Sequence, residues 1–155
     1  MIVAVADTGP LIHLAEIDAL ELLSVVDDLL IPETVLDELE TGTVPPSLST
    51  IEYELVEADT ADLTGDLDPG ETAALAVAAD RSAVLLTDDL AAREAATDRD
   101  IEVHGSIGIL VLGYQRGELS KSNAIERMRA LQAETSLFVT DAVVERGVEL
   151  LESSG

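Results

Sequence analysis

Several acidic side chains follow apolar segments directly, in a pattern that could build a metal-dependent hydrolytic site. Asp7 comes immediately after the apolar run 2–6, and Asp88 and Asp89 come one residue after the apolar run 83–86. Apolar runs of this kind are typical of buried parallel strands. Adjacent parallel strands end at the same edge of a sheet, and open α/β sheets place their chemistry at that edge. We therefore expect these carboxylates to gather there.

Carboxylates gathered in this way repel one another, and a bound cation relieves the repulsion. Mg²⁺ and Mn²⁺ prefer oxygen ligands from a few carboxylates, completed by water and phosphate. Such a site suits hydrolysis of a phosphodiester, because a bound metal activates water and stabilises the leaving oxygen. Two further acids, Glu38 and Glu71, lie on predicted helices and complete the candidate set.

Each of these acids also has a purely structural interpretation. Asp7 could cap the helix that follows it, and Asp88 or Asp89 could cap the helix that runs towards Arg93. Arg93 stands four residues after Asp89, so the two could form an ion pair on that helix, or Arg93 could instead contact a phosphate. The run from Asp68 to Glu71 resembles a capping box with a proline at the first helical position.

Glu38 could likewise be a solvated helix residue, because its angular position does not separate it from Glu40. The two histidines, His13 and His104, are more often surface or packed residues than ligands.

Strand-like and helix-like segments alternate along the chain, which predicts an α/β fold with a mostly parallel sheet. Strands are expected at 2–6, 29–31, 51–56, 83–86 and 101–104. Helices are expected after Asp7, from Pro32 to Gly42, from Glu71 onward, towards Arg93, and at 20–26, 106–115, 120–133 and 141–151. With 155 residues and no convincing linker, we expect one domain, 1–155.

The composition indicates the environment in which the protein works and says little about its activity. The formal charge is −24, from 32 acids against 8 bases, and Lys121 is the one lysine. Strong salt screening removes most of the self-repulsion of such a chain, so a halophilic source is expected. All 8 bases lie in residues 81–155, where contacts to a polyanion are expected. Without cysteine, a secretory signal or a long apolar run, we expect a cytoplasmic protein without a membrane span.

Five segments together resemble a PIN domain, and cover nearly the whole chain in order. They are VADTGPLIHL, IPETVLDELE, LDPGETAALAVAA, VLLTDDLAAR and VHGSIGILVLGYQRGEL. More narrowly, they are similar to a small prokaryotic branch with a GE helix and a DD-x-x-A-R segment. The resemblance implies a PIN-like three-layer α/β/α sandwich with an acidic pocket that holds Mg²⁺ or Mn²⁺. It also implies a metal-dependent ribonuclease acting on RNA, often the toxin of a VapBC-type toxin–antitoxin pair.

Carried over by position, the resemblance gives the acids separate roles. Asp7, Glu38, Glu71 and Asp89 would be catalytic, and the metal ligands would come from Asp7, Glu71, Asp88 and Asp89. Glu71 stands where the common toxin branch has aspartate, and Asp88 is an additional acid beside the Thr-x-Asp position. Thr8, Thr87 and Arg93 would support the site, the threonines by orienting carboxylates or water through their hydroxyls. An antitoxin and a second copy of the chain are the expected protein partners.

Two other functional classes stay open on the sequence. One is a non-catalytic PIN-type module that binds protein or RNA, which predicts neither cleavage nor metal-linked stabilisation. The other is a phosphoacceptor receiver domain, which also gathers aspartates at strand ends. A receiver requires a lysine near the pocket, and Lys121 stands well after the last predicted strand.

Overall fold

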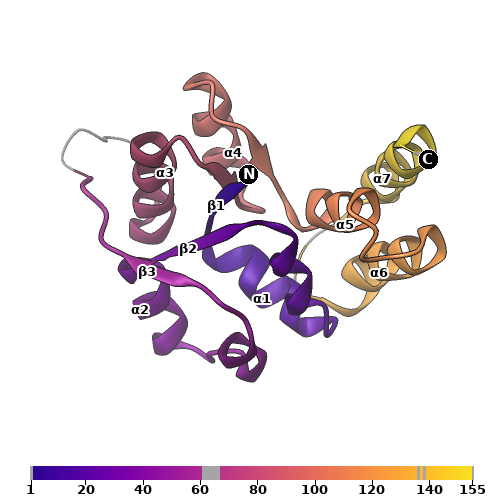
Figure 1. The fold of residues 1–155 in the computed structure, drawn as a ribbon, viewed down its shortest axis with the longest axis horizontal. Helices are drawn as coiled ribbons and strands as arrows, with labels where there is room; N and C mark the ends of the chain where they lie inside the picture. The colour runs from indigo at the N-terminus through magenta and orange to yellow at the C-terminus, as the bar shows by residue number, and fades with distance from the viewer. Residues whose placement is uncertain (1, 61–66, 136, 138, 155) are drawn as a thin grey trace.

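Five parallel strands form a single sheet in a computed structural model, which describes residues 2–60, 67–135, 137 and 139–154 (Figure 1). The strands are β1 (Val3–Ala6), β2 (Asp28–Pro32), β3 (Glu54–Val56), β4 (Val84–Leu86) and β5 (Val103–His104). Their order across the sheet is β3-β2-β1-β4-β5. The chain proceeds outward from β1 through β2 in one direction and from β4 to β5 in the other. The junction of β1 and β4 is therefore the switch point, where open α/β sheets bind ligands.

Helices connect and cover these strands. They are α1 (Thr8–Glu16), α2 (Glu33–Thr41), α3 (Pro69–Arg81), α4 (Leu90–Asp98), α5 (Ser106–Gln115), α6 (Lys121–Glu134) and α7 (Asp141–Ser154). Two 3₁₀ segments, η1 (Leu20–Val25) and η2 (Pro46–Thr50), complete the described elements.

The sheet lies between two helical layers, and successive strand residues serve opposite layers. Val5, Leu30 and Leu85 belong to a core cluster with α3 and α4. Ala6 and Ile31 belong to the larger cluster on the other face, which α1, η1, α5 and α6 cover. Both faces are thus apolar, as expected for a parallel sheet covered on each side. The predicted three-layer α/β/α architecture is confirmed.

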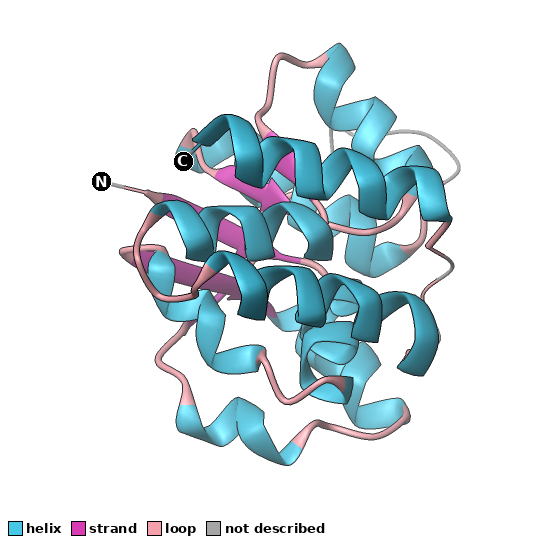
Figure 2. Cartoon of the chain, turned by 90° about the vertical axis from the view of Figure 1, so that its right-hand side faces the viewer, coloured by secondary structure: helices cyan, strands magenta, loops and turns pink. Residues whose placement is uncertain are grey.

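The last three helices, α5, α6 and α7, lie against one another beside the sheet (Figure 2). Met128 of α6 is fully buried beneath Gly147 of α7, where an added Cβ would lie 2.9 Å from its sulfur. This close approach allows α7 to pack tightly on its neighbours. In the described part of the chain, no helix is both long enough and apolar enough to cross a membrane.

The predicted elements are present, with differences mainly at their ends. The segment 51–56 is a strand only at 54–56, and 101–104 only at 103–104, because each pairs with one neighbour at the edge of the sheet. The short helical segment predicted at 20–26 is a 3₁₀ helix at 20–25, and Pro32 ends β2 instead of beginning α2.

Candidate active site

Asp7 lies at the switch point and is almost completely buried, with 3% of its surface exposed. Its Oδ1 accepts a hydrogen bond of 2.8 Å from the backbone N–H of Thr8, and its Oδ2 accepts one of 2.9 Å from the hydroxyl of Thr87. Thr87 directly follows β4 and is fully buried, and its hydroxyl holds the carboxylate in one orientation. Thr8 contacts the same carboxylate through its backbone N–H rather than through its hydroxyl.

Burial raises the pKa of Asp7 from 3.8 to about 6. The two hydrogen bonds from Thr8 and Thr87 oppose this shift, whereas the negative charges of Asp68 and Glu38 add to it. A carboxyl group with such a pKa is held in an environment that disfavours its charge, a feature that is common at functional sites.

Glu38 turns inward from α2 to the first turn of α3. Its Oε1 accepts a hydrogen bond of 2.8 Å from the backbone N–H of Gly70, and burial raises its pKa. Glu38 is half-buried, whereas its neighbours Asp37 and Glu40 are exposed. The structure therefore distinguishes Glu38 from Glu40, which helical spacing could not do.

Gly70 makes this contact sterically feasible. A Cβ at position 70 would lie 2.3 Å from Oε2 of Glu38, far closer than two such atoms can approach. A residue with a side chain at position 70 would therefore displace the glutamate from the helix terminus.

Asp68 and Glu71 form the predicted capping box at the start of α3. Oδ1 of Asp68 accepts a hydrogen bond of 2.8 Å from the N–H of Glu71, and Oε2 of Glu71 accepts one of 3.3 Å from the N–H of Asp68. Burial raises the pKa of Glu71 to about 7, and the charges of Asp68 and Asp89 contribute to the increase. The capping role therefore coexists with a strongly perturbed carboxyl group, so the helix cap does not exclude a chemical role for Glu71.

Asp89 caps α4, because its Oδ2 accepts a hydrogen bond of 2.9 Å from the N–H of Ala92. Its own N–H donates to the hydroxyl of Thr87 at 3.2 Å, which links it to the residue that orients Asp7. The ion pair with Arg93 that the helical spacing allows is not formed. Within the described residues, no carboxylate oxygen lies within 4.0 Å of a nitrogen of the Arg93 guanidinium.

Asp88, the additional acid, contacts different partners from those of Asp89. Its Oδ2 lies 2.8 Å from Nδ1 of His13 and accepts a hydrogen bond of 2.6 Å from the hydroxyl of Ser106. Its Oδ1 accepts a second bond of 2.6 Å from the N–H of Ser106. Burial alone would raise the pKa of Asp88, but the hydrogen bonds from His13 and Ser106 outweigh it and hold the pKa below its usual value. The carboxylate thereby joins α1 and α5 to the end of β4.

The candidate acids form a chain of electrostatic neighbours around the switch point. Asp7 is influenced by Glu38 and Asp68, and Glu71 is influenced by Asp68 and Asp89. Asp88 is not part of this chain and contacts His13 and Ser106 instead. Among the residues that the structure describes, no group of three or more His, Asp or Glu side chains is arranged closely enough to hold a metal ion. The ligand set implied by the resemblance therefore stays a prediction.

Sequence reasoning missed four contributors to this region. The sequence pattern around Asp68 indicates only a helix cap, yet its charge acts on Asp7, Glu38 and Glu71. The roles of Gly70, His13 and Ser106 depend on contacts across 32, 75 and 18 residues, which no local pattern reveals.

Comparison with known proteins adds an independent observation. A family model described as DUF3368, a PIN domain, matches residues 3–153. The chain belongs to the PIN-domain family. The predicted family and fold class are thus confirmed, and PIN domains are typically nucleases that use divalent metals.

A solved PIN-type structure has a similar fold. It is a PilT N-terminus domain protein, SSO1118, from the hyperthermophilic archaeon Sulfolobus solfataricus P2. The TM-score is 0.56 at 15% identity, and the match covers 70% of this chain and 90% of that one. This similarity shows the PIN fold alone. No curated protein matches the chain.

Proposed function

We propose that this PIN domain is a metal-dependent endoribonuclease that hydrolyses RNA phosphodiester bonds. The observation that supports it most is Asp7, a buried carboxyl group at the switch point, whose pKa of about 6 reflects burial and the nearby charges of Asp68 and Glu38. Such a carboxylate is costly to ionise without a counter-charge. In a family of nucleases that use divalent metals, this cost is best explained by a cation that the folded protein is built to bind.

The donor atoms fit a hard dication. Every candidate ligand offers carboxylate oxygen, which is the ligand type that Mg²⁺ and Mn²⁺ prefer. Asp7, Glu71 and Asp89 would hold the ion, and Asp88 would join them by giving up hydrogen bonds to His13 or Ser106. When bound, the cation would supply an activated water and stabilise the leaving oxygen.

The chain's own residues prepare the remaining parts of the reaction. Thr87 and the N–H of Thr8 hold Asp7 in one orientation, and the N–H of Gly70 holds Glu38 at the rim of the site. Burial raises the pKa of Glu71 to about 7 in the metal-free protein, so its carboxylate, like that of Asp7, would be favoured in its ionised form by a bound cation. We assign Glu71 the role of a ligand that holds the ion at the start of α3.

The biological setting that we propose follows from the sequence motifs and the charge. The motifs are similar to those of VapC-type toxins, which supports a role as the toxin of a type II pair with an antitoxin as partner. A short open reading frame that overlaps this one would support the pairing, and its absence would favour a free-standing nuclease. The charge of −24 supports a cytoplasm with high salt as the working environment.

RNA cleavage under controlled metal supply tests the proposal. The purified protein is incubated with labelled single-stranded and structured RNAs in molar KCl, with Mn²⁺, with Mg²⁺ or with EDTA. We expect cleavage with either metal and none in EDTA. Cleavage that is equally fast in EDTA, or the absence of cleavage of any RNA with both metals, would overturn it.

A second candidate function is a non-catalytic binding module. It is favoured by the lack, within the described residues, of three acidic or histidine side chains that converge on one metal position. This candidate predicts that neither Mn²⁺ nor Mg²⁺ changes the melting temperature at any salt concentration. The ribonuclease predicts an increase, so one thermal titration separates the two.

A further inference from the structure

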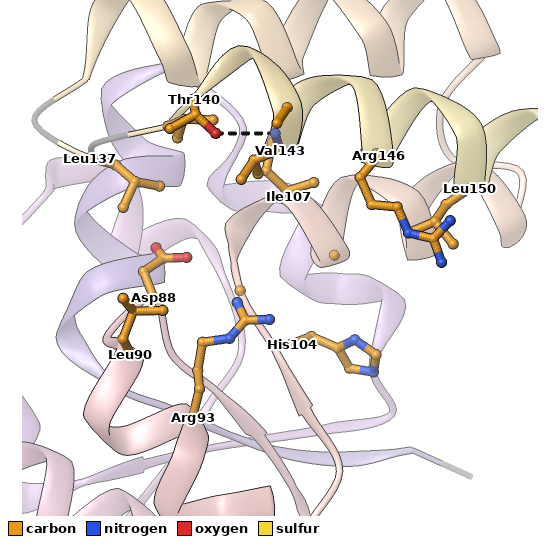
Figure 3. Close-up of a pocket in the computed structure, with 15 residues that line it drawn as sticks. Asp88, Leu90, Arg93, His104, Ile107, Leu137, Thr140, Val143, Arg146 and Leu150 are labelled. Carbon is orange, nitrogen blue, oxygen red and sulfur yellow. Dashed lines mark hydrogen bonds between the residues drawn. The ribbon is translucent and has the colours of Figure 1, made fainter.

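An open cavity begins beside Asp88, next in the chain to Asp89, and extends between α4, α5 and α7 (Figure 3). Its volume is about 690 Å³, which is the size of a typical ligand pocket. The walls are mainly aliphatic, with Leu90 from α4 and Val143 from α7 both exposed to solvent. Leu90 is 76% exposed at the start of α4, so this wall of the cavity is open to a ligand from solvent.

Three basic side chains line the same cavity. Arg93 extends from α4, Arg146 from α7, and His104 lies at the end of β5 (Figure 3). Only 8 of the 155 residues are Lys or Arg, so two arginines beside one cavity form a marked local concentration of positive charge. Asp88 is the one acid among the described residues that line this cavity, and its oxygens already accept hydrogen bonds within the fold.

Neither arginine is held firmly by an acid. The guanidinium of Arg93 lies over Gly105, where an added Cβ would be 2.5 Å from one of its nitrogens, and among the described residues it has no ion pair. Arg146 pairs with Glu149 at 3.3 Å, but both side chains are about two-thirds exposed. An exposed pair of this kind contributes little stability. Both guanidinium groups can therefore bind an anionic ligand without breaking a strong ion pair.

We propose that this cavity is the path of the RNA strand as it leaves the acidic site, with Arg93 and Arg146 contacting its phosphates. The inference rests on the proposed ribonuclease function and extends it by naming the surface that holds the substrate. Phosphates favour guanidinium groups, which bind them in a bidentate manner. Unpaired bases pack against apolar walls and guanidinium planes, so the substrate class is single-stranded RNA. A cavity of this size holds about one or two unpaired nucleotides.

The position of the cavity is consistent with this path. Elsewhere the carboxyl edge of the sheet carries Glu38, Asp68 and Glu71, whose charges repel phosphate. A strand that reaches the acids must therefore be held by a neighbouring surface of opposite charge. In this part of the molecule, the cavity lined by Arg93 and Arg146 provides it.

Binding of a short, unstructured, fluorescein-labelled oligouridylate tests the proposal by fluorescence anisotropy, in EDTA so that no cleavage occurs. The variant Arg93→Gln/Arg146→Gln should bind at least about tenfold more weakly at low salt than the parent protein. For single-stranded nucleic acid, each phosphate contact contributes about 0.7 to the steepness of log K against log [KCl]. The loss of two contacts should therefore make the slope of this variant less steep by about 1.4. The variant Arg93→Lys/Arg146→Lys, which keeps both charges, should retain most of the slope.

A matched control removes two charges at the opposite edge of the sheet. Arg81 ends α3 and Arg99 follows α4, both exposed and both shortly before a strand begins, so Arg81→Gln/Arg99→Gln should change neither affinity nor slope appreciably. Far-ultraviolet circular dichroism verifies that each variant folds. If the double variant in the cavity does not fold, Arg146→Gln alone, on an exposed side chain, should lower the slope by about 0.7.

The outcomes separate this inference from the proposed function. If the parent cleaves RNA but the cavity variant binds the oligouridylate as tightly as the parent, the proposed RNA path is wrong. That result would instead favour a protein segment as the ligand of the cavity. A parent that shows no anisotropy change in EDTA would also overturn it. Binding that requires Arg93 and Arg146, in a protein that cleaves nothing with Mn²⁺, would support the path and remove the nuclease.

Discussion

The backbone N–H of Gly70 donates a hydrogen bond of 2.8 Å to Oε1 of Glu38, so the second acid of the site is held by the first turn of α3. The contact joins α2 to α3 across 32 residues. It also explains the order of residues in the segment from Asp68 to Glu71. Asp68 caps the helix, Pro69 begins it, and Gly70 leaves room for a carboxylate from another helix.

Replacing Gly70 by alanine should therefore lower activity much more than stability. The new Cβ would overlap Oε2 of Glu38, and the glutamate side chain is long enough to rotate away. We expect RNA cleavage to fall about tenfold or more, while the free energy of unfolding changes by about 1 kcal/mol or less. Initial cleavage rates and urea unfolding measure the two effects. Gly42→Ala, where the nearest atom would be 3.9 Å away, is the matched control and should leave the rate unchanged.

Ionisation of Asp7 should make the metal-free protein less stable as the pH rises. Its pKa is raised on folding from 3.8 to about 6, so its stabilising contribution is complete below about pH 4 and is lost as the pH passes through 6. The loss is about 3 kcal/mol. Asp7→Asn keeps an acceptor for Thr8 and a partner for Thr87, so it should be more stable than the parent near pH 8 in EDTA.

Urea unfolding at about pH 4 and about pH 8, with constant molar KCl, measures this difference. The gap between Asp7→Asn and the parent should be large at the higher pH and small at the lower one. Asp37→Asn, at an exposed position on α2, provides the control. Equal stabilities of Asp7→Asn and the parent near pH 8 would show that the buried carboxylate carries no such cost.

Binding of Mn²⁺ should offset the free-energy cost of ionising Asp7. A ligand that binds only the folded state stabilises it by about 2.7 kcal/mol at a hundred times its dissociation constant. The melting temperature of the parent and of Asp37→Asn should therefore rise with Mn²⁺ near pH 8, whereas that of Asp7→Asn should not. A rise of the same size in Asp7→Asn would place the bound metal elsewhere.

Replacement of Asp88 distinguishes a metal ligand from a structural link. Its carboxylate accepts hydrogen bonds from Ser106 and lies against His13, so Asp88→Asn should destabilise the metal-free protein by about 1.5–3 kcal/mol. This effect has the opposite sign to that of Asp7→Asn. Urea unfolding in EDTA measures it. An increase in stability would mean that Asp88 resembles Asp7, whose pKa is raised by burial.

Much of the fold was predictable from the sequence because local and global signals coincide. The apolar runs before Asp7 and Thr87 predicted adjacent buried strands, and the capping box of Asp68 and Glu71 predicted the start of α3. The positions of Asp7 and of the Asp88–Asp89 pair beside the switch point followed from this topology.

The rest depends on contacts between distant segments. Helical spacing could not separate Glu38 from Glu40, because their difference lies in the approach of Gly70. The sequence also left open which of the adjacent residues Asp88 and Asp89 caps α4. In the structure Asp89 is the cap, and Asp88 contacts His13 and Ser106. The same limit applies to Arg93, whose helical spacing to Asp89 allowed an ion pair that the fold does not form.

The most direct measurement of the central claim is the initial rate of RNA cleavage by the parent, Asp7→Asn and Asp37→Asn, with saturating Mn²⁺ in molar KCl. Asp7→Asn keeps the size of the side chain and one acceptor oxygen and removes one negative charge, and Asp37→Asn removes the same charge from the surface of α2. We predict that Asp7→Asn lowers the rate at least about a hundredfold and that Asp37→Asn leaves it unchanged. Equal rates in all three proteins would contradict a nuclease site at the switch point.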